Sequence, residues 1–260
     1  MNATRDSRGI LALYALGGLA AFFGAWAVAS LAGAAPERFL PPPWKVWDEF
    51  WRLTREPFVG ATLQQHLASS FARMGMGFGL AVAIGVPLGL AMGWFRTFDF
   101  IVSPLFDALR FVAPIAWVPF AALWFGTGIG GPVLVIFTGA FPPCVINTYR
   151  GARHVDPHLV EAAQTLGAGH WKMMTEVLLP ASVPSIVAGL RVSAGLAWQS
   201  LVGAELIVAS SGIGYLLVKG QAAIATPIVM SGMIAIGLVG FVIDLLLQAL
   251  ERWIQRRRGR

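Results

Sequence analysis

The fold is decided by one charged segment in an otherwise apolar chain, Asp156-Pro-His-Leu-Val-Glu161-Ala-Ala-Gln-Thr-Leu-Gly167. Asp156 can cap a helix that begins at Pro157. Proline suits this first position because it lacks the backbone N–H that would be unsatisfied there. Apolar residues recur at i, i+3, i+4 and i+7 from Leu159, which gives one apolar face. Gly167 can adopt the left-handed conformation that ends a helix. The segment therefore predicts a short amphipathic helix.

A second short helix is expected after this turn, over a segment that ends in Val177-Leu-Leu-Pro180. Its apolar side would consist of Trp171, Met174 and Leu178. Pro180, followed by Pro184, would end it, because a proline inside a helix removes a hydrogen bond and clashes with the preceding turn. The whole segment thus predicts a helix–turn–helix between membrane spans.

This segment resembles the Glu-Ala-Ala loop of permease subunits in binding-protein-dependent ABC importers. The residues that match the family pattern are Glu161, Ala162, Ala163, Gly167, Val177, Leu179 and Pro180. The resemblance implies an all-α membrane protein with six transmembrane helices, of the type I ABC importer permease class, whose loop helices couple to an ATPase. The alternative is an amphipathic loop on the membrane surface, but such helices usually carry a polar face rich in lysine and arginine.

Composition places the chain in a membrane. Of its 260 residues, 57% are hydrophobic and 12% are charged, whereas a soluble domain carries about 25% charged residues. The net charge of +6 does not predict a nucleic-acid partner, because the basic residues are not clustered on an element that could enter a groove. The single cysteine, Cys144, provides neither an intramolecular disulfide nor a multi-cysteine metal site.

Six apolar runs predict six spans, over residues 10–31, 65–94, 101–125, 132–149, 184–208 and 227–250. The first run could be a signal peptide, but it is long enough to cross the membrane and is expected to be a retained span. The predicted organisation is an N-terminal span with an external interfacial segment (1–64), a permease core (65–250) with the coupling loop at 150–183, and a basic cytoplasmic tail (251–260).

Charge asymmetry predicts the orientation. With both termini in the cytoplasm, the inner segments hold Arg5, Arg8, Arg96, Arg150, Arg153, Lys172, Arg252, Arg256, Arg257, Arg258 and Arg260. The outer segments hold only Arg38, Lys45, Arg52, Arg55 and Lys219. This distribution follows the positive-inside rule for a bacterial inner-membrane protein. It places the Glu-Ala-Ala loop in the cytoplasm, within reach of an ATPase.

Two patterns predict helix surfaces. Trp44, Trp47 and Trp51 are spaced as on one face of a short helix at the membrane–water interface. Small residues recur every fourth position in the second run, at Ala81, Gly85, Gly89 and Gly93. Such a stripe lets two membrane helices approach closely, so we interpret it as a packing surface.

The third run is expected to break. Pro114 and Pro119 interrupt it, and irregular backbone at membrane depth is tolerated only inside protein or along a cavity. This makes Arg110, Pro114, Trp117 and Pro119 candidates for lining the translocation pathway. The segment also partly resembles a proline-rich stretch of nitrate-, sulfonate- and taurine-type permeases. The glycine-rich segment 126–131 is interpreted as a turn, because no strand–helix unit for a dinucleotide surrounds it.

Ionisable residues inside spans need a partner or a role, because each costs at least ~2.5–3.5 kcal/mol at the membrane centre. Glu205 follows Arg191 by 14 positions, about 21 Å along a helix. A partner for either must therefore come from another span or subunit. Arginines that face a cavity would instead suit an oxyanion. With Trp198 between them, Arg191 and Glu205 complete the pathway candidates.

The chain is similar along most of its length to the nitrate/sulfonate/taurine group of these permeases, which implies the membrane subunit of an ATP-driven importer for a small anion such as an alkanesulfonate, taurine or nitrate. By resemblance, two copies form the pore, two ATPase subunits that bind ATP and Mg²⁺ lie beneath them, and a periplasmic or surface-tethered binding protein delivers substrate. The chain itself shows no catalytic constellation and is expected to need no cofactor. The alternative is a secondary transporter that uses Asp107, Glu205 or Asp244 as an ion site.

Overall fold

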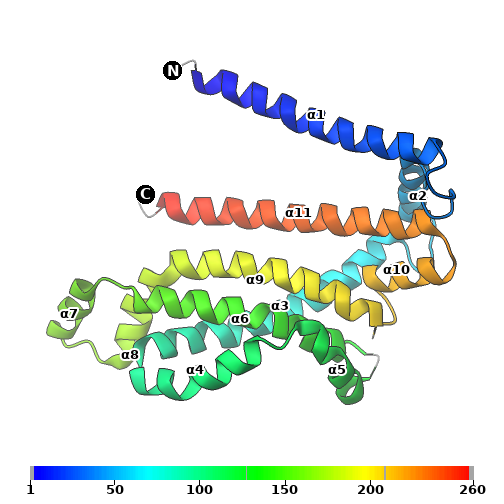
Figure 1. Cartoon of the computed structure of the whole chain (residues 1–260). Coiled ribbons are helices and arrows are strands. Elements are labelled where there is room, and N and C mark those ends of the chain that lie inside the picture. The colour runs from blue at the N-terminus through cyan, green and yellow to red at the C-terminus, as the bar shows by residue number, and fades with distance from the viewer. Residues whose placement is uncertain (1–2, 127, 208, 258–260) are drawn as a thin grey trace. The chain divides into compact units, whose positions relative to one another are not determined.

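The computed structural model describes residues 3–126, 128–207 and 209–257, and the elements it assigns there are helices (Figure 1). In order they are α1 (Ala3–Leu31), α2 (Pro43–Arg55), α3 (Leu63–Trp94), α4 (Arg96–Arg110), the 3₁₀ helix η1 (Pro114–Trp117), α5 (Val118–Phe125) and α6 (Gly130–Arg153). These are followed by α7 (Pro157–Thr165), α8 (His170–Lys172), the π-helix η2 (Met173–Leu178), α9 (Leu179–Ile207), α10 (Ile213–Ala222) and α11 (Thr226–Arg257). Thr127, Val208 and residues 258–260, which fall within predicted segments, lie outside the described residues.

Among the described residues, five helical segments are long and apolar enough to cross a membrane. A sixth span is obtained if α4 and the segment Pro114–Phe125 are counted together, although they are bent by 88° relative to each other. The predicted break in the third run is therefore confirmed. It lies just before Pro114, where Ala113 takes the extended backbone (ψ 138°) that a following proline favours. The glycine turn predicted over 126–131 is shorter than expected: α5 ends at Phe125, Gly126 follows with a positive φ of 62°, and Gly130 already begins α6.

The chain divides into two compact units, of which the larger comprises residues 64–215 and 235–260. Its centre is the contact between α6 and α9, which lie side by side. Ile136 and Ala140 of α6 pack with Ala197 and Leu201 of α9 in the buried core. Ser193 Oγ donates a hydrogen bond to the carbonyl of Ala140 across the same contact (2.5 Å). Such small and hydroxylated residues permit close helix packing in a membrane, where lipid provides no hydrophobic drive between helices.

The small-residue stripe of α3 packs against α6, as predicted. Ala81 is fully buried. A Cβ atom added to Gly85 would lie 3.2 Å from Cys144, and one added to Gly89 would lie 2.7 Å from Thr148. The glycines therefore hold the two backbones closer than any larger residue would allow.

Replacing Gly89 with leucine should destabilise the protein by ~1–3 kcal/mol, the usual range for overpacking a tight contact. Gly79 provides a control on the same helix, because an added Cβ there meets nothing within 4 Å. We expect Gly79→Leu to unfold at the wild-type temperature in detergent and Gly89→Leu several degrees lower. Equal melting temperatures would show that the stripe is not a packing surface.

The smaller unit comprises residues 1–63 and 216–234. Here α1 is tied to the segment before α2 by the indole N–H of Trp26, which donates to the carbonyl of Pro41 (3.0 Å). α2 buries Val46 and Leu53, and the hydroxyl of Ser231 in α11 donates to the carbonyl of Val46 (2.9 Å). The three tryptophans of α2 lie on its exposed side, each about half exposed (Trp44, Trp47 and Trp51). This matches the face expected of an interfacial helix.

Candidate coupling and translocation sites

The coupling loop folds locally as its sequence predicts. Asp156 Oδ1 accepts a hydrogen bond from the backbone N–H of His158 (2.9 Å), which caps α7. Gly167 has a φ of +78°, and its N–H donates to the carbonyl of Gln164 (2.9 Å). The N–H of Ala168 donates to the carbonyl of Ala163 (3.0 Å). These two bonds form a Schellman motif, so Ala163 and Gly167 of the matched pattern together make the turn.

The second half of the loop differs from the prediction. Pro180 and Pro184 do not end a short helix; helical structure runs without interruption from His170 to Ile207. The π-helical turn η2 lies directly before Pro180, and the N–H of Leu179 bonds to the carbonyl of Met174, five residues earlier. This wider turn relieves the clash of the Pro180 ring with the carbonyl four residues before it. Val177, Leu179 and Pro180 therefore join the coupling loop to a membrane span rather than closing the loop.

The loop exposes large apolar side chains. Leu166 is 88% exposed, Trp171 is 76% exposed and Leu159 is 53% exposed. We call these three residues the loop surface. The prediction that Trp171 and Leu178 share one side is wrong, because Leu178 is 2% exposed and packs inward. Glu161 and Ala162 are exposed on α7, with the Glu161 carboxylate 3.9 Å from His158.

An aromatic contact that the sequence did not reveal holds the start of the second helix. His170 Nδ1 accepts a hydrogen bond from the indole N–H of Trp94 (3.3 Å), and the His170 ring also lies against Phe95. Trp94 and Phe95 form the junction between α3 and α4. The loop is therefore positioned by the ends of two membrane helices as well as by its own backbone.

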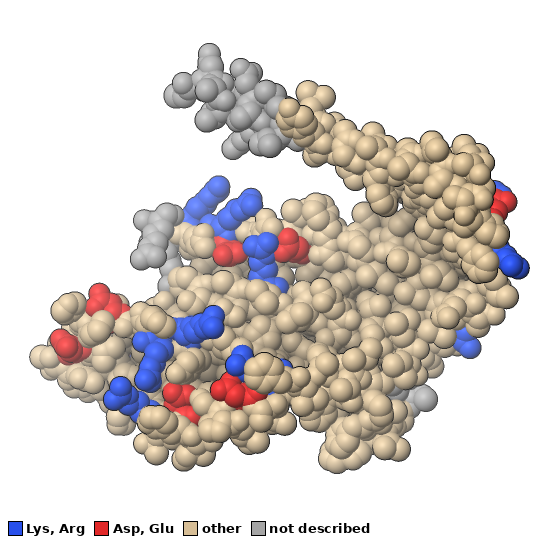
Figure 2. Space-filling model, in the orientation of Figure 1, with Lys and Arg blue, Asp and Glu red and all other residues tan. Residues whose placement is uncertain are grey.

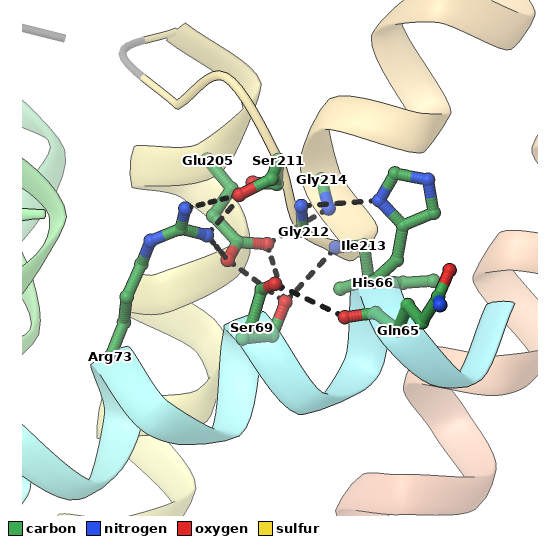
Figure 3. Close-up of polar contacts among 10 residues, drawn as sticks. Gln65, His66, Ser69, Arg73, Glu205, Ser211, Gly212, Ile213 and Gly214 are labelled. Carbon is green, nitrogen blue, oxygen red and sulfur yellow. Dashed lines mark hydrogen bonds and ion pairs between the residues drawn. The ribbon is translucent and has the colours of Figure 1, made fainter. Parts of the chain in front are cut away.

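A buried polar network occupies the opposite end of α9 (Figure 3). The carboxylate of Glu205 is fully buried and lies 2.7 Å from Arg73 Nη1 of α3. Ser70 Oγ contacts both carboxylate oxygens at 2.8 Å. Arg73 also donates to the carbonyl and the hydroxyl of Ser211 (2.8 and 2.6 Å). The partner of Glu205 thus comes from another span, as the spacing required, but it is Arg73 and not Arg191.

The same network holds the backbone that leads into α10. Three successive N–H groups each donate to a side chain from another helix. Gly212 donates to His66 Nδ1 (3.2 Å), Ile213 to Ser70 Oγ (3.0 Å) and Gly214 to Glu205 Oε2 (3.0 Å). These are groups that a helix start leaves without an intrahelical partner, and here they are satisfied inside the protein. The network therefore fixes the N-terminal part of α3 and the C-terminal end of α9 to one turn.

Arg191 does not belong to this buried network. Its guanidinium binds Asp244 of α11 (2.7 and 3.3 Å) and lies 3.5 Å from Glu251. These groups line an open cavity of about 530 Å³ along α9. Trp198 is buried, and its indole N–H donates to the carbonyl of Ile236 (3.1 Å).

The remaining pathway candidates lie around α4 and η1. Arg110 pairs with Asp107 one turn earlier on α4 (2.8 Å), and Arg110 and Trp117 line a common pocket against α6. Pro114 begins η1, and Pro119 lies in the first turn of α5. The structure therefore does not gather all the candidates around one cavity of a single chain. The carboxylates suggested for an ion-coupled transporter, Asp107, Glu205 and Asp244, are each paired with an arginine.

Comparison with known proteins agrees with this architecture. A family model described as "Binding-protein-dependent transport system inner membrane component" matches residues 85–260. The taurine transport system permease protein TauC of Escherichia coli (strain K12) is 36% identical over 228 residues, covering 87% of this chain and 82% of that protein. The bicarbonate transport system permease protein CmpB of Synechococcus elongatus is 32% identical over 254 residues, covering 94% and 90%.

A solved structure shares the fold at low sequence identity. It is titled "Inward facing conformations of the MetNI methionine ABC transporter" and superposes with a TM-score of 0.63 at 16% identity. The match covers 74% of this chain and 95% of that one. On the matched family model and on relatives at more than 30% identity over most of their length, this chain belongs to the binding-protein-dependent inner-membrane permeases of ABC importers.

Proposed function

We propose that this permease subunit imports a small anion and is driven by ATPase subunits that dock on the loop surface. The observation that carries the proposal is the loop itself. Its backbone is fixed by a cap, a Schellman turn and the Trp94–His170 contact, yet Leu166 and Trp171 remain exposed. A rigid scaffold that presents exposed apolar side chains is typical of a protein-binding site. Glu161 adds a charge that a partner could recognise.

The remaining partners follow from family membership. A binding protein would deliver substrate on the side opposite the loop, and a second copy of this chain would complete the pore. ATP and Mg²⁺ would be held by the ATPase subunits. Both termini and the loop would lie in the cytoplasm, as the distribution of basic residues favours.

The proposal of an anionic substrate rests on two relatives, whose names specify taurine and bicarbonate transport. Arg191, with Pro114 and Pro119 of the bent span, is proposed to line the pathway between two copies. Since Arg191 is engaged by Asp244 and Glu251 in this conformation, binding of an anion there would require the cluster to rearrange.

Uptake into proteoliposomes tests energy source and substrate together. The permease is reconstituted with the subunits that co-purify with it and the cognate binding protein, and radiolabelled taurine, ethanesulfonate, nitrate and bicarbonate are supplied. We expect uptake of at least one anion only when ATP reaches the ATPase side. Uptake driven by a proton or sodium gradient without ATP would instead identify a secondary transporter.

A further inference from the structure

We propose that a groove between α4 and α6 binds an anionic phospholipid, with its phosphate near Arg110 and Arg150 and an acyl chain along an aromatic cleft. Two adjoining pockets make the groove. The first holds about 250 Å³ and is lined by Met92, Ser103, Phe106, Asp107, Arg110, Val145, Ile146, Tyr149 and Arg150. The second holds about 190 Å³ and is lined mainly by apolar side chains. They share Phe106 and Arg110 in their linings, so they adjoin, and we call the two together the groove.

The first pocket has the chemistry of a headgroup site. Two arginines and one aspartate line it, and since Arg110 is paired with Asp107 (2.8 Å), Arg150 supplies the net positive charge of the lining. The phenol of Tyr149 and the hydroxyl of Ser103 both donate to the neighbouring carboxylate of Asp99 (3.0 and 2.6 Å), so both hydroxyls are held in place beside the arginines. Figure 2 shows acidic and basic side chains together over the region of α4, and a second mixed group over the C-terminal part of α11. Basic pockets between membrane helices are typical sites for acidic lipid headgroups.

The second pocket has the chemistry of an acyl-chain site. Its lining includes Leu109, Val112, Trp117, Phe137 and Phe141. A small inorganic oxyanion would gain nothing from such a surface, whereas a hydrocarbon chain would be well packed against it. The combination of a basic pocket and an apolar cleft therefore favours an amphiphile.

The order of the two pockets matches one membrane leaflet. Along α6, the basic pocket lies at Val145–Arg150, near the helix end that leads to the coupling loop, and the apolar pocket lies deeper, from Leu134 to Pro142. Phe141, at the near end of the apolar pocket, lies ~14 Å from Arg150 at 1.5 Å per residue along α6. One leaflet with its headgroups measures about 20–22 Å, so this end of the apolar pocket lies within reach of an acyl chain whose headgroup is at Arg150.

The surroundings of the groove also indicate lipid rather than an aqueous passage. On α4, Phe100 is 79% exposed, Ile101 70% and Leu105 64%. Large apolar side chains of this kind would be costly in a water-filled pathway but are ordinary against lipid. The proposal therefore assigns Arg110 to lipid binding instead of to the pathway suggested by the sequence. It does not depend on which substrate is imported.

Lipid titration of the purified full-length protein tests the headgroup site. Native mass spectrometry in detergent compares phosphatidylglycerol with phosphatidylcholine of identical acyl chains. We expect phosphatidylglycerol to bind at least tenfold more tightly. Arg110→Gln and Arg150→Gln should each weaken it about fivefold, and together ~30-fold, since each basic side chain contributes ~1 kcal/mol. Arg252→Gln removes the same charge from the exposed end of α11 and should leave binding unchanged. Equal binding of the two lipids, or equal loss in Arg252→Gln, would overturn the proposal.

The acyl-chain site has an independent test that needs no charge change. Phosphatidylglycerol with brominated chains is added to the protein in detergent at a few lipids per chain. It should quench the fluorescence of Trp117, measured as the difference between wild type and Trp117→Phe, and brominated phosphatidylcholine should not. If Trp117 responds instead to ethanesulfonate and ignores brominated lipid, the groove belongs to the imported anion. The same result from both brominated lipids would show unspecific contact and would also reject the site.

Discussion

Uptake should fall at least tenfold in Gly167→Asp, while Gly167→Asn remains within about threefold of wild type. Both residues tolerate the left-handed conformation that Gly167 adopts at a φ of +78°. A Cβ atom at this position meets nothing within 4 Å, so neither side chain disturbs the fold. The two variants differ mainly in charge, and an unpaired carboxylate buried against a partner costs several kcal/mol.

The control for this pair is thermal unfolding of the isolated permease. Both variants should melt close to wild type, whereas Gly167→Val should melt lower, since a β-branched residue is strained in the left-handed region. Normal uptake by Gly167→Asp would show that this turn does not face the ATPase. Loss of uptake by Gly167→Asn as well would mean that the docked partner approaches the bare backbone too closely for any side chain.

Breaking the Arg73–Glu205 pair should produce the largest loss of stability of any single substitution considered. Removing one partner of a buried ion pair costs ~3–5 kcal/mol, because the other charge remains buried without compensation. In Arg73→Gln the Glu205 carboxylate keeps Ser70 and Gly214 but loses its only cationic contact among the described residues. The turn at Ser211 also loses both of its bonds to Arg73.

Unfolding of Arg73→Gln, Glu205→Gln and the double variant in detergent measures this loss. We expect each single variant to melt well below wild type. The double variant should recover part of the difference, because two neutral glutamines leave no buried charge without a partner. Arg191→Gln is the matched control, since its partners on α11 are partly exposed, and its shift should be much smaller. Equal shifts for Arg73→Gln and Arg191→Gln would contradict the account of the network.

The parts of this protein that could be predicted are those whose conformation depends on residues adjacent in the sequence. Asp156, Pro157 and Gly167 each favour one backbone conformation, so the cap, the helix start and the turn of the coupling loop could be predicted. The glycine stripe of α3 also predicts close helix packing, whichever helix is its partner. The prediction that Pro180 ends a helix was wrong because the helix accommodates this proline with a π turn. That accommodation depends on the fold of the following span.

Pairings between distant segments could not be predicted from one sequence. Arg73, Arg191, Glu205 and Asp244 are all charges inside apolar runs, and nothing in their spacing says which of them meet. A signal for the network was nevertheless present. Ser70 and Arg73 lie one turn apart near the start of α3, so they share a face that an apolar span would not otherwise need. The contact between Trp94 and His170 left no comparable signal.

The most direct test of the central claim is affinity purification of the tagged protein from native membranes in mild detergent, with ATPase activity measured on the eluate. We predict that an ATPase subunit co-purifies with the wild-type chain. It should be lost when Leu166 and Trp171 are both replaced by alanine, which removes the most exposed part of the loop surface without touching the core. A chain that purifies without ATPase activity, or a double variant that retains all of it, would contradict docking at the loop surface.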